Sequence, residues 1–110
     1  MSTYQNTAPA IYILWEGFRP IYVGKSRNVK NRWRQHRGAL KRGEHENSDL
    51  QDAYNNRSPS APWRFTTHWV MPDEVAKVLD KAQQDALLLS LERSTIDLMR
   101  DLNFALTNER

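Results

Sequence analysis

Two tyrosines stand ten residues apart, each in a short segment with the pattern of a strand. Tyr12 ends the segment Ala-Ile-Tyr at residues 10–12, and Tyr22 begins the segment Tyr-Val-Gly at residues 22–24. Residues 16–20 between them, Glu-Gly-Phe-Arg-Pro, carry the glycine and proline typical of a hairpin loop. The two phenols are therefore expected on neighbouring antiparallel strands, where paired side chains come together. An arginine and a glutamate follow, as a site that cuts phosphodiester bonds would need.

The arginine, Arg32, belongs to a segment that predicts a helix from about Asn28 to Lys41. At about 100° per residue, the apolar residues of this helix form one stripe, and Arg32 and His36 lie on one border of it, a turn apart. Both would be half-buried and could point at a common centre. The alternative is that Arg32 only extends over the edge of the core while His36 is a hydrogen-bonded boundary histidine.

The glutamate, Glu92, lies on the last predicted helix inside its apolar stripe, one turn from Leu88 and from Ile96. The rest of that stripe is Leu91, Thr95, Met99 and Leu102. An unpaired buried charge costs several kcal/mol, so Glu92 should pair with an arginine, bind a metal ion or take up a proton. A structural salt bridge is the simplest alternative.

The positive charge of the chain is concentrated in one segment. No acidic residue occurs between Glu16 and Glu44, whereas residues 25–42 hold 8 of the 16 basic residues, which leaves the remainder with more acidic than basic side chains. A cationic segment on a mildly anionic body favours binding of a polyanion. On the helix, four of these cations lie beside the apolar stripe on the border opposite Arg32 and His36, as a row that could contact phosphates: Lys30, Arg34, Arg37 and Lys41.

The remaining patterns complete an α+β domain. Strands are predicted at 10–15, 21–24 and 63–70, and a short helix at about 48–54, where Ser48 and Gln51 have the spacing of a capping box. Helical sequence runs from Pro72 to about Asp101. A straight helix of that length would be roughly 45 Å long, too long for a domain of this size, so a break is expected near residues 80–84. A small three-stranded antiparallel sheet flanked by helices follows.

Composition limits the classes of protein that fit. A chain of 110 residues makes a single domain, with residues 1–8 expected as a flexible N-terminal lead. Without cysteine it has neither a disulfide-linked partner nor a thiolate zinc site. It also lacks the pattern of a signal peptide and any run of about 18 apolar residues, so a cytoplasmic protein with no membrane partner is expected.

Taken together, these residues resemble the GIY-YIG nuclease domain over nearly the whole chain. The resemblance rests on residues 10–12 and 22–24, on the segment from Lys25 to Trp33, on Gly43 to Asn47 before Leu50-Gln51, on Glu92 and on a late asparagine. The chain departs from the family pattern at Ala10, where the first motif has glycine, and at Val23, where the second has isoleucine. Neither change removes a functional group, but the methyl group at position 10 could alter the approach of the backbone to a substrate.

The resemblance implies an endonuclease that hydrolyses DNA phosphodiester bonds with Mg²⁺, for which Mn²⁺ could substitute. Tyr12 and Tyr22 would hold and activate the attacking water, with Tyr12 preferred over His36 as the base. Arg32 would bind the scissile phosphate, His36 would support the phenol or the phosphate, and Glu92 would be the metal ligand. A phenol with a pKa of about 10 needs nearby cations to act as a base, and Arg32 with Lys25 could supply them.

Several assignments stay open at this point. The late asparagine of the family is Asn108 or Asn103, with Asn108 preferred because residues 105–108 resemble the closing turn of the family. His45 and Asn47 would order the loop beside the site or start the next helix. Lys25 and Arg27 would join the cationic row in binding DNA, whereas Trp15, Trp63 and Trp69 are expected to fill the core and its edges. A nucleic-acid-binding module without turnover is the alternative to the enzyme.

Overall fold

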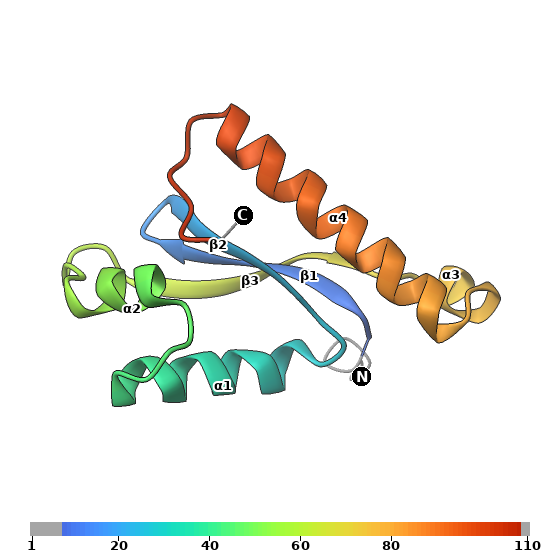
Figure 1. Ribbon diagram of the computed structural model, residues 1–110, viewed down its shortest axis with the longest axis horizontal. Helices are drawn as coiled ribbons and strands as arrows, with labels where there is room; N and C mark the ends of the chain where they lie inside the picture. The colour runs from blue at the N-terminus through green and yellow to red at the C-terminus, as the bar shows by residue number, and fades with distance from the viewer. Residues whose placement is uncertain (1–7, 109–110) are drawn as a thin grey trace.

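The computed structural model describes residues 8–108, so residues 1–7 of the expected N-terminal lead lie outside the described part. In chain order the elements are β1 (Ala10–Glu16), β2 (Arg19–Ser26), α1 (Val29–Arg42), α2 (Ser48–Asn55), β3 (Trp63–Val70), α3 (Asp73–Val78) and α4 (Lys81–Asp101). They form the expected α+β fold, a three-stranded antiparallel sheet flanked by four helices (Figure 1). Among the described residues, none of the helices combines the length and apolar character needed to cross a membrane.

The sheet has the strand order β2-β1-β3, so β1 is central and pairs with both neighbours. The hairpin is tighter than the sequence predicted, because β1 continues to Glu16 and β2 starts at Arg19. Only two residues turn the chain, and the first of them, Gly17, has φ 61°, a left-handed conformation that glycine adopts without strain. The expected loop at 16–20 and strand at 21–24 were therefore wrong at these boundaries.

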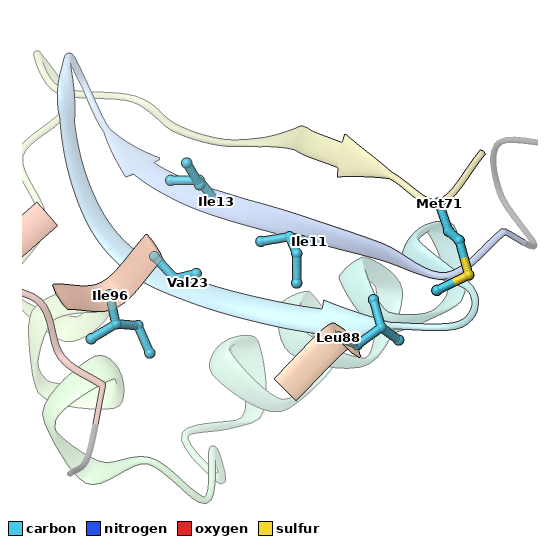
Figure 2. Packing of buried hydrophobic residues seen from close by; sticks show 6 residues of the cluster. All are labelled: Ile11, Ile13, Val23, Met71, Leu88 and Ile96. Atoms are coloured by element: carbon cyan, nitrogen blue, oxygen red, sulfur yellow. The ribbon is translucent and has the colours of Figure 1, made fainter. Parts of the chain in front are cut away.

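The two faces of the sheet carry different cores. Side chains alternate along a strand, so β1 sends one set of apolar residues toward α4 and the other toward α1 and α2. The α4 side holds a buried cluster of Ile11, Ile13, Val23, Met71, Leu88 and Ile96 (Figure 2). On the other side Leu14 and Ile21 pack with Leu40 of α1 and Leu50 of α2. Burying one such side chain stabilises the fold by about 1.5–3 kcal/mol.

Capping residues fix where α1 and α2 begin. The side chain of Asn28 accepts a hydrogen bond from the amide of Asn31 at the start of α1, and Asn47 does the same for Leu50 in α2. The capping box predicted from Ser48 and Gln51 is therefore wrong, since Asn47 caps the helix one residue earlier. The Gln51 side chain instead accepts from the amide of His45 and donates to the carbonyl of Leu40, which ties α2 to the loop and to α1.

The predicted interruption of the last helical segment is confirmed, between Val78 and Lys81. Asp80 caps α4 in a reciprocal capping box with Gln83. The expected stripe of α4 holds for Leu88, Thr95 and Ile96, which are buried. It is wrong for Leu102, which is 57% exposed because it follows the last residue of the helix.

After α4 the chain returns to the outer edge of β2. The amide and the hydroxyl of Thr107 both donate to the carbonyl of Ile21, and the side chain of Asn108 bonds to the amide and the carbonyl of Val23. Asn47 in turn donates to the carbonyl of Thr107. Residues 107 and 108 thereby link the sheet edge to the start of α2.

Candidate active site

The two tyrosines lie together on the α1 face of the sheet, as predicted. Tyr12 pairs with Gly24 and Tyr22 pairs with Leu14 across the hairpin, which places the two ring centroids 6.4 Å apart. The His36 ring lies 5.8 Å from that of Tyr12 and 5.4 Å from that of Tyr22, so α1 supplies the third member of the cluster. His36 is only 1% exposed, more deeply buried than its expected border position.

Gly24 makes room for the Tyr12 phenol. A Cβ atom at position 24 would collide with the Cζ and the hydroxyl oxygen of Tyr12, which crosses directly over the glycine. A side chain here would have to displace the ring, so the glycine of the second motif is required by a close approach across the strand pair. Ala10, the departure from the first motif, is fully buried against Tyr12 and Val29, so its methyl group faces the core.

A chain of hydrogen bonds runs from the loop before α2 to the Tyr12 hydroxyl. The amide of Asn47 donates to Nδ1 of His45 at 3.0 Å, so in neutral His45 the hydrogen is on Nε2. That atom lies 2.7 Å from Nδ1 of His36, which must accept. The His36 hydrogen is then on Nε2, 2.6 Å from the Tyr12 oxygen. The backbone amide thus sets both tautomers, and His36 donates to Tyr12.

Both histidines are held neutral by their surroundings. Burial, with smaller contributions from Arg32 and His45, lowers the pKa of His36 to about 3. Burial also lowers the pKa of His45, with a net decrease even though the nearby Glu46 acts in the opposite direction. Neutral rings are what the hydrogen-bond chain requires, because a proton on Nδ1 of His45 would face the amide of Asn47.

These depressed values predict that the protein loses stability as the pH falls below about 6.5. An unfolded histidine takes up a proton near that pH, whereas folded His36 does not, so acid favours the unfolded chain. We expect the free energy of unfolding to fall by about 1–2 kcal/mol between about pH 6.5 and 5, above the range in which most carboxylates titrate. Urea unfolding at several pH values measures it, and His36→Gln should remove most of the dependence. An unchanged pH slope in that variant would contradict the assignment.

Arg32 lies half-buried beside the phenols, on the border where it was predicted. Its guanidinium donates to Gln35 and lies 4.0 Å from a carboxylate oxygen of Glu46. Burial raises the pKa of both Tyr12 and Tyr22, and the charge of Arg32 partly opposes this. The expected cationic field is therefore present, but in the protein alone burial outweighs it. Lys25, the other expected source, acts instead on Glu92.

Glu92 projects from α4 between buried Leu88 and Ile96, as predicted, and is itself half-buried. Desolvation raises the pKa of its carboxyl group, against the charges of Lys25 and Arg93. Within residues 8–108, neither a hydrogen bond nor a salt bridge joins it to another side chain, so the predicted alternative of a structural salt bridge is not found. A negative charge on Glu92 raises the pKa of Tyr12 and of Tyr22, so the carboxylate lies within electrostatic reach of both phenols.

Glu92 could serve a metal ion that takes few ligands from the protein. The described part of the chain contains no group of three or more acidic, histidine or cysteine side chains arranged to hold an ion. A single unpaired carboxylate, completed by water and substrate oxygens, is a coordination that suits Mg²⁺. Glu92 is the residue of this site that could hold such an ion.

The two candidate asparagines occupy different places. Asn108 lines a shallow hollow with Tyr22, Glu46 and Asn47, and both polar groups of its side chain bond to the backbone of Val23. Asn103 is exposed just beyond α4, with a left-handed φ of 70°. Asn108 is thus the one beside the tyrosines, where it positions β2.

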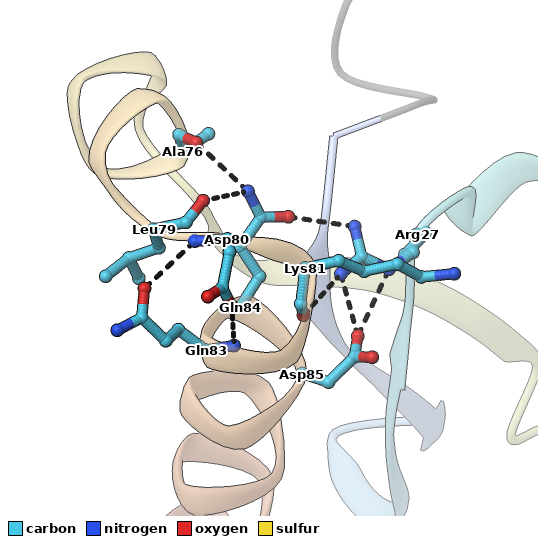
Figure 3. Close-up of polar contacts among 8 residues, drawn as sticks. All are labelled: Arg27, Ala76, Leu79, Asp80, Lys81, Gln83, Gln84 and Asp85. Atoms are coloured by element: carbon cyan, nitrogen blue, oxygen red, sulfur yellow. Dashed lines mark hydrogen bonds and ion pairs between the residues drawn. The ribbon is translucent and has the colours of Figure 1, made fainter.

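The predicted cations differ in how they are engaged. Lys25, Lys30, Arg34, Arg37 and Lys41 are all exposed. Arg27 is different, because it donates to Asp85, to the side chain of Gln84 and to the carbonyl of Lys81 (Figure 3). This network joins the end of β2 to the start of α4, so Arg27 has a structural role, and its predicted contact with DNA stays a prediction.

Sequence reasoning missed the direct contact between His45 and His36. His45 was expected to order the loop or to start the helix, and Asn47 does cap α2, but the two imidazoles also stack with centroids 4.9 Å apart. The signal in the sequence was a second histidine nine residues after the first, across the glycine that ends α1.

Comparison with known proteins agrees with this geometry. The family described as the GIY-YIG catalytic domain matches residues 8–104, which include every predicted site residue except Asn108. No curated protein and no solved structure matches the chain.

Proposed function

The chain belongs to the GIY-YIG family of nucleases, and we propose that it is a divalent-metal-dependent endonuclease that hydrolyses phosphodiester bonds in DNA. One observation carries the proposal: two phenols, an arginine and a neutral histidine from three elements share one site, and an unpaired carboxylate from a fourth element lies within electrostatic reach of the phenols. Holding groups of this kind together has no structural purpose that apolar residues would not serve better.

In this proposal Tyr12 is the general base. Its hydroxyl accepts the hydrogen bond from His36, which leaves its own proton free to leave and stabilises the phenolate that results. His36 cannot take that proton while its Nδ1 accepts from His45, so the hydrogen-bond direction favours Tyr12 over His36. His36 and His45 are then positioning residues.

The difference in exposure between the two tyrosines favours Tyr22 as the general base. Tyr12 is 1% exposed, whereas Tyr22 is partly exposed and lines the hollow beside Asn108. Water reaches Tyr22 directly, whereas it reaches Tyr12 only if side chains packed around that ring move. The two tyrosines are therefore assigned by the paired substitutions described in the Discussion.

Arg32 and Glu92 would each help to stabilise the negative charge of the reacting phosphate, Arg32 directly and Glu92 through a metal ion. Arg32 would contact the scissile phosphate, since a guanidinium matches the geometry of two phosphate oxygens. Glu92 would hold Mg²⁺, with Mn²⁺ as a substitute. When bound, such an ion stabilises negative charge on the phosphate and on the leaving oxygen.

The exposed cations of α1 would bind the DNA backbone. Lys30, Arg34, Arg37 and Lys41 face solvent on the helix that also carries Arg32, and Lys25 is exposed at the end of β2. The salt slope is the steepness with which the logarithm of the binding constant falls as the logarithm of the salt concentration rises. Each cation that neutralises a phosphate adds about 0.9 to the salt slope of binding to duplex DNA.

A matched pair of substitutions on α1 separates binding from chemistry. Arg34→Ala should weaken DNA binding and lower its salt slope by about one unit or less, with little change in the cleavage rate at saturating DNA. Arg32→Ala, two residues away, should instead lower the saturated rate. Filter binding across a salt series and single-turnover cleavage measure the two effects. Equal loss of saturated rate in both variants would contradict the division.

The alternative is a binding module that keeps the scaffold without turnover. Plasmid, single-stranded and branched DNA should be incubated with the protein in Mg²⁺ and, as a control, in EDTA. Cleavage that requires the metal supports the enzyme. Binding to the same substrates without any cleavage would leave only the module.

A further inference from the structure

A groove of about 730 Å³ lies on the α1 face of the sheet, between α1, the end of α2 with the loop that follows it, and β3. Its volume is within the range of about 300–1,000 Å³ found for ligand-binding sites. Four aromatic residues line it: Trp33 of α1, Tyr54 of α2, and Trp63 and Phe65 of β3. All four are partly exposed, so the groove offers ring surfaces from three separate elements.

The charge of the groove has one sign. Arg37 and Lys41 line it from α1 and Arg57 from the loop after α2, and all three are exposed. Arg64 of β3 also borders the groove, but its guanidinium lies 5.1 Å from the ring of Trp15, which packs against the core on the α4 face. Among the described residues that line the groove, none is acidic. The groove therefore presents positive charge alone, complementary to a polyanion.

The rings are arranged as platforms. Trp33 stacks on Phe65 with centroids 5.3 Å apart, and Tyr54 meets Trp63 edge to face at 5.4 Å. The guanidinium of Arg57 lies 3.8 Å from the centroid of Tyr54 and donates to the Tyr54 carbonyl, so it covers one face of this ring and leaves the other for a base. Trp33 also has the only buried side-chain polar atom among residues 8–108 that lacks a hydrogen-bond partner, its indole Nε1.

The groove adjoins the candidate active site through a shared residue. The Phe65 ring lies 6.2 Å from that of Tyr12 and 5.9 Å from that of His36, while Arg37 lies over the same ring at 5.8 Å. The groove and the site are therefore neighbours, with Phe65 as the wall between them.

We propose that this groove binds an unpaired strand of DNA beside the site of cleavage. Unpaired bases would stack on the aromatic faces, and the three cations would follow the phosphates, which is how single strands are held without sequence preference. In a duplex the base faces are covered by one another, so the groove favours single-stranded or branched substrates. That the strand is DNA rests on the proposed function, whereas the groove itself does not.

The first experiment tests the role of charge. Fluorescence anisotropy measures the binding of a short labelled oligo(dT) over a salt series, in EDTA so that no cleavage occurs. Arg57→Gln should lower the salt slope by about 0.7, the contribution of one cation on a single strand. Its matched control is Lys77→Gln, an equal loss of charge on an exposed residue outside the groove, which should leave the slope unchanged.

The stacking arm uses the intrinsic fluorescence of tryptophan. Trp63 lines the groove, whereas Trp69 packs against the core on the α4 face. Oligo(dT) should quench the emission, and Trp63→Phe should remove part of that quenching while Trp69→Phe keeps it. Tyr54→Ala should weaken binding by between about 5-fold and 100-fold, the effect of losing one stacked base. Circular dichroism confirms the fold of each variant, and Arg57→Gln, at an exposed residue, tests the groove even if an aromatic variant unfolds.

Three results would overturn the proposal: an unchanged salt slope in the arginine variant, equal affinity for a duplex of the same length, or equally strong competition by polyglutamate. Tighter binding of oligo(rU) would overturn the assignment to DNA. The experiments distinguish failure of the groove proposal from failure of the nuclease proposal. Groove-dependent binding without cleavage in Mg²⁺ would retain the groove and remove the nuclease, and cleavage with groove-independent binding would do the reverse.

Discussion

Glu92→Ala is expected to reduce DNA cleavage to the background level, a loss of at least about 100-fold, while DNA binding stays nearly intact. The side chain is proposed to hold the metal ion and not the DNA backbone, so its loss should appear in the saturated rate. The free energy of unfolding should not fall, because a half-buried carboxylate whose pKa is raised by desolvation is itself a cost to the metal-free fold. Single-turnover cleavage in Mg²⁺ and urea unfolding measure the two effects.

The matched control for this variant is Glu74→Ala, which removes an exposed acid from α3. Glu92→Gln adds a second comparison, since it keeps the size of the side chain and removes its charge. If Glu92→Ala cuts DNA within a few-fold of the wild-type rate, the assignment of the metal ligand is wrong. If it cuts normally only in Mn²⁺, the Glu92 carboxylate is one of several ligands of the ion, and the DNA and water supply the others.

Tyr12→Phe is expected to lower the saturated cleavage rate by about 10²–10⁴-fold, the usual cost of losing a general base. Phenylalanine keeps the ring, which is buried against Ala10 and Val29, and deletes only the hydroxyl that His36 contacts. A tyrosine with a purely structural role would behave differently. Its loss of one hydrogen bond would change stability by about 1 kcal/mol and leave turnover unaffected.

Tyr22→Phe is the matched comparison, because both rings lie on the same face of the same hairpin. It should lose less activity if Tyr22 only orients the water or the other phenol. The reverse ranking would assign the base to Tyr22, in keeping with its greater exposure. Both variants should be measured at saturating Mg²⁺ and DNA, with circular dichroism to confirm the fold.

Local patterns were enough to predict the elements and the inward-facing site residues. Alternation along β1 and β2 placed both tyrosines on one face, and helical periodicity placed Arg32 and His36 together on α1, because each depends only on the geometry of one element or one hairpin. The position of Glu92 between Leu88 and Ile96 followed in the same way.

Features that depend on irregular backbone could not be predicted. The contact of His45 with His36 requires the loop after Gly43 to fold back along α1, and no periodicity describes a loop. The tight hairpin depended on the conformation of Gly17, and the α2 cap on which of two adjacent polar residues turned its side chain inward. The groove needed three elements to be placed in space, so Trp63 was expected only as a core residue.

The hydrogen bonds of Thr107 and Asn108 to Ile21 and Val23 have a consequence beyond the site. The outer edge of a sheet exposes unpaired amides and carbonyls that can recruit a strand from another molecule, and such pairing leads to aggregation. Here the chain occupies part of the β2 edge with its own later residues. This pairing within one chain lowers the chance that two copies of the protein join edge to edge.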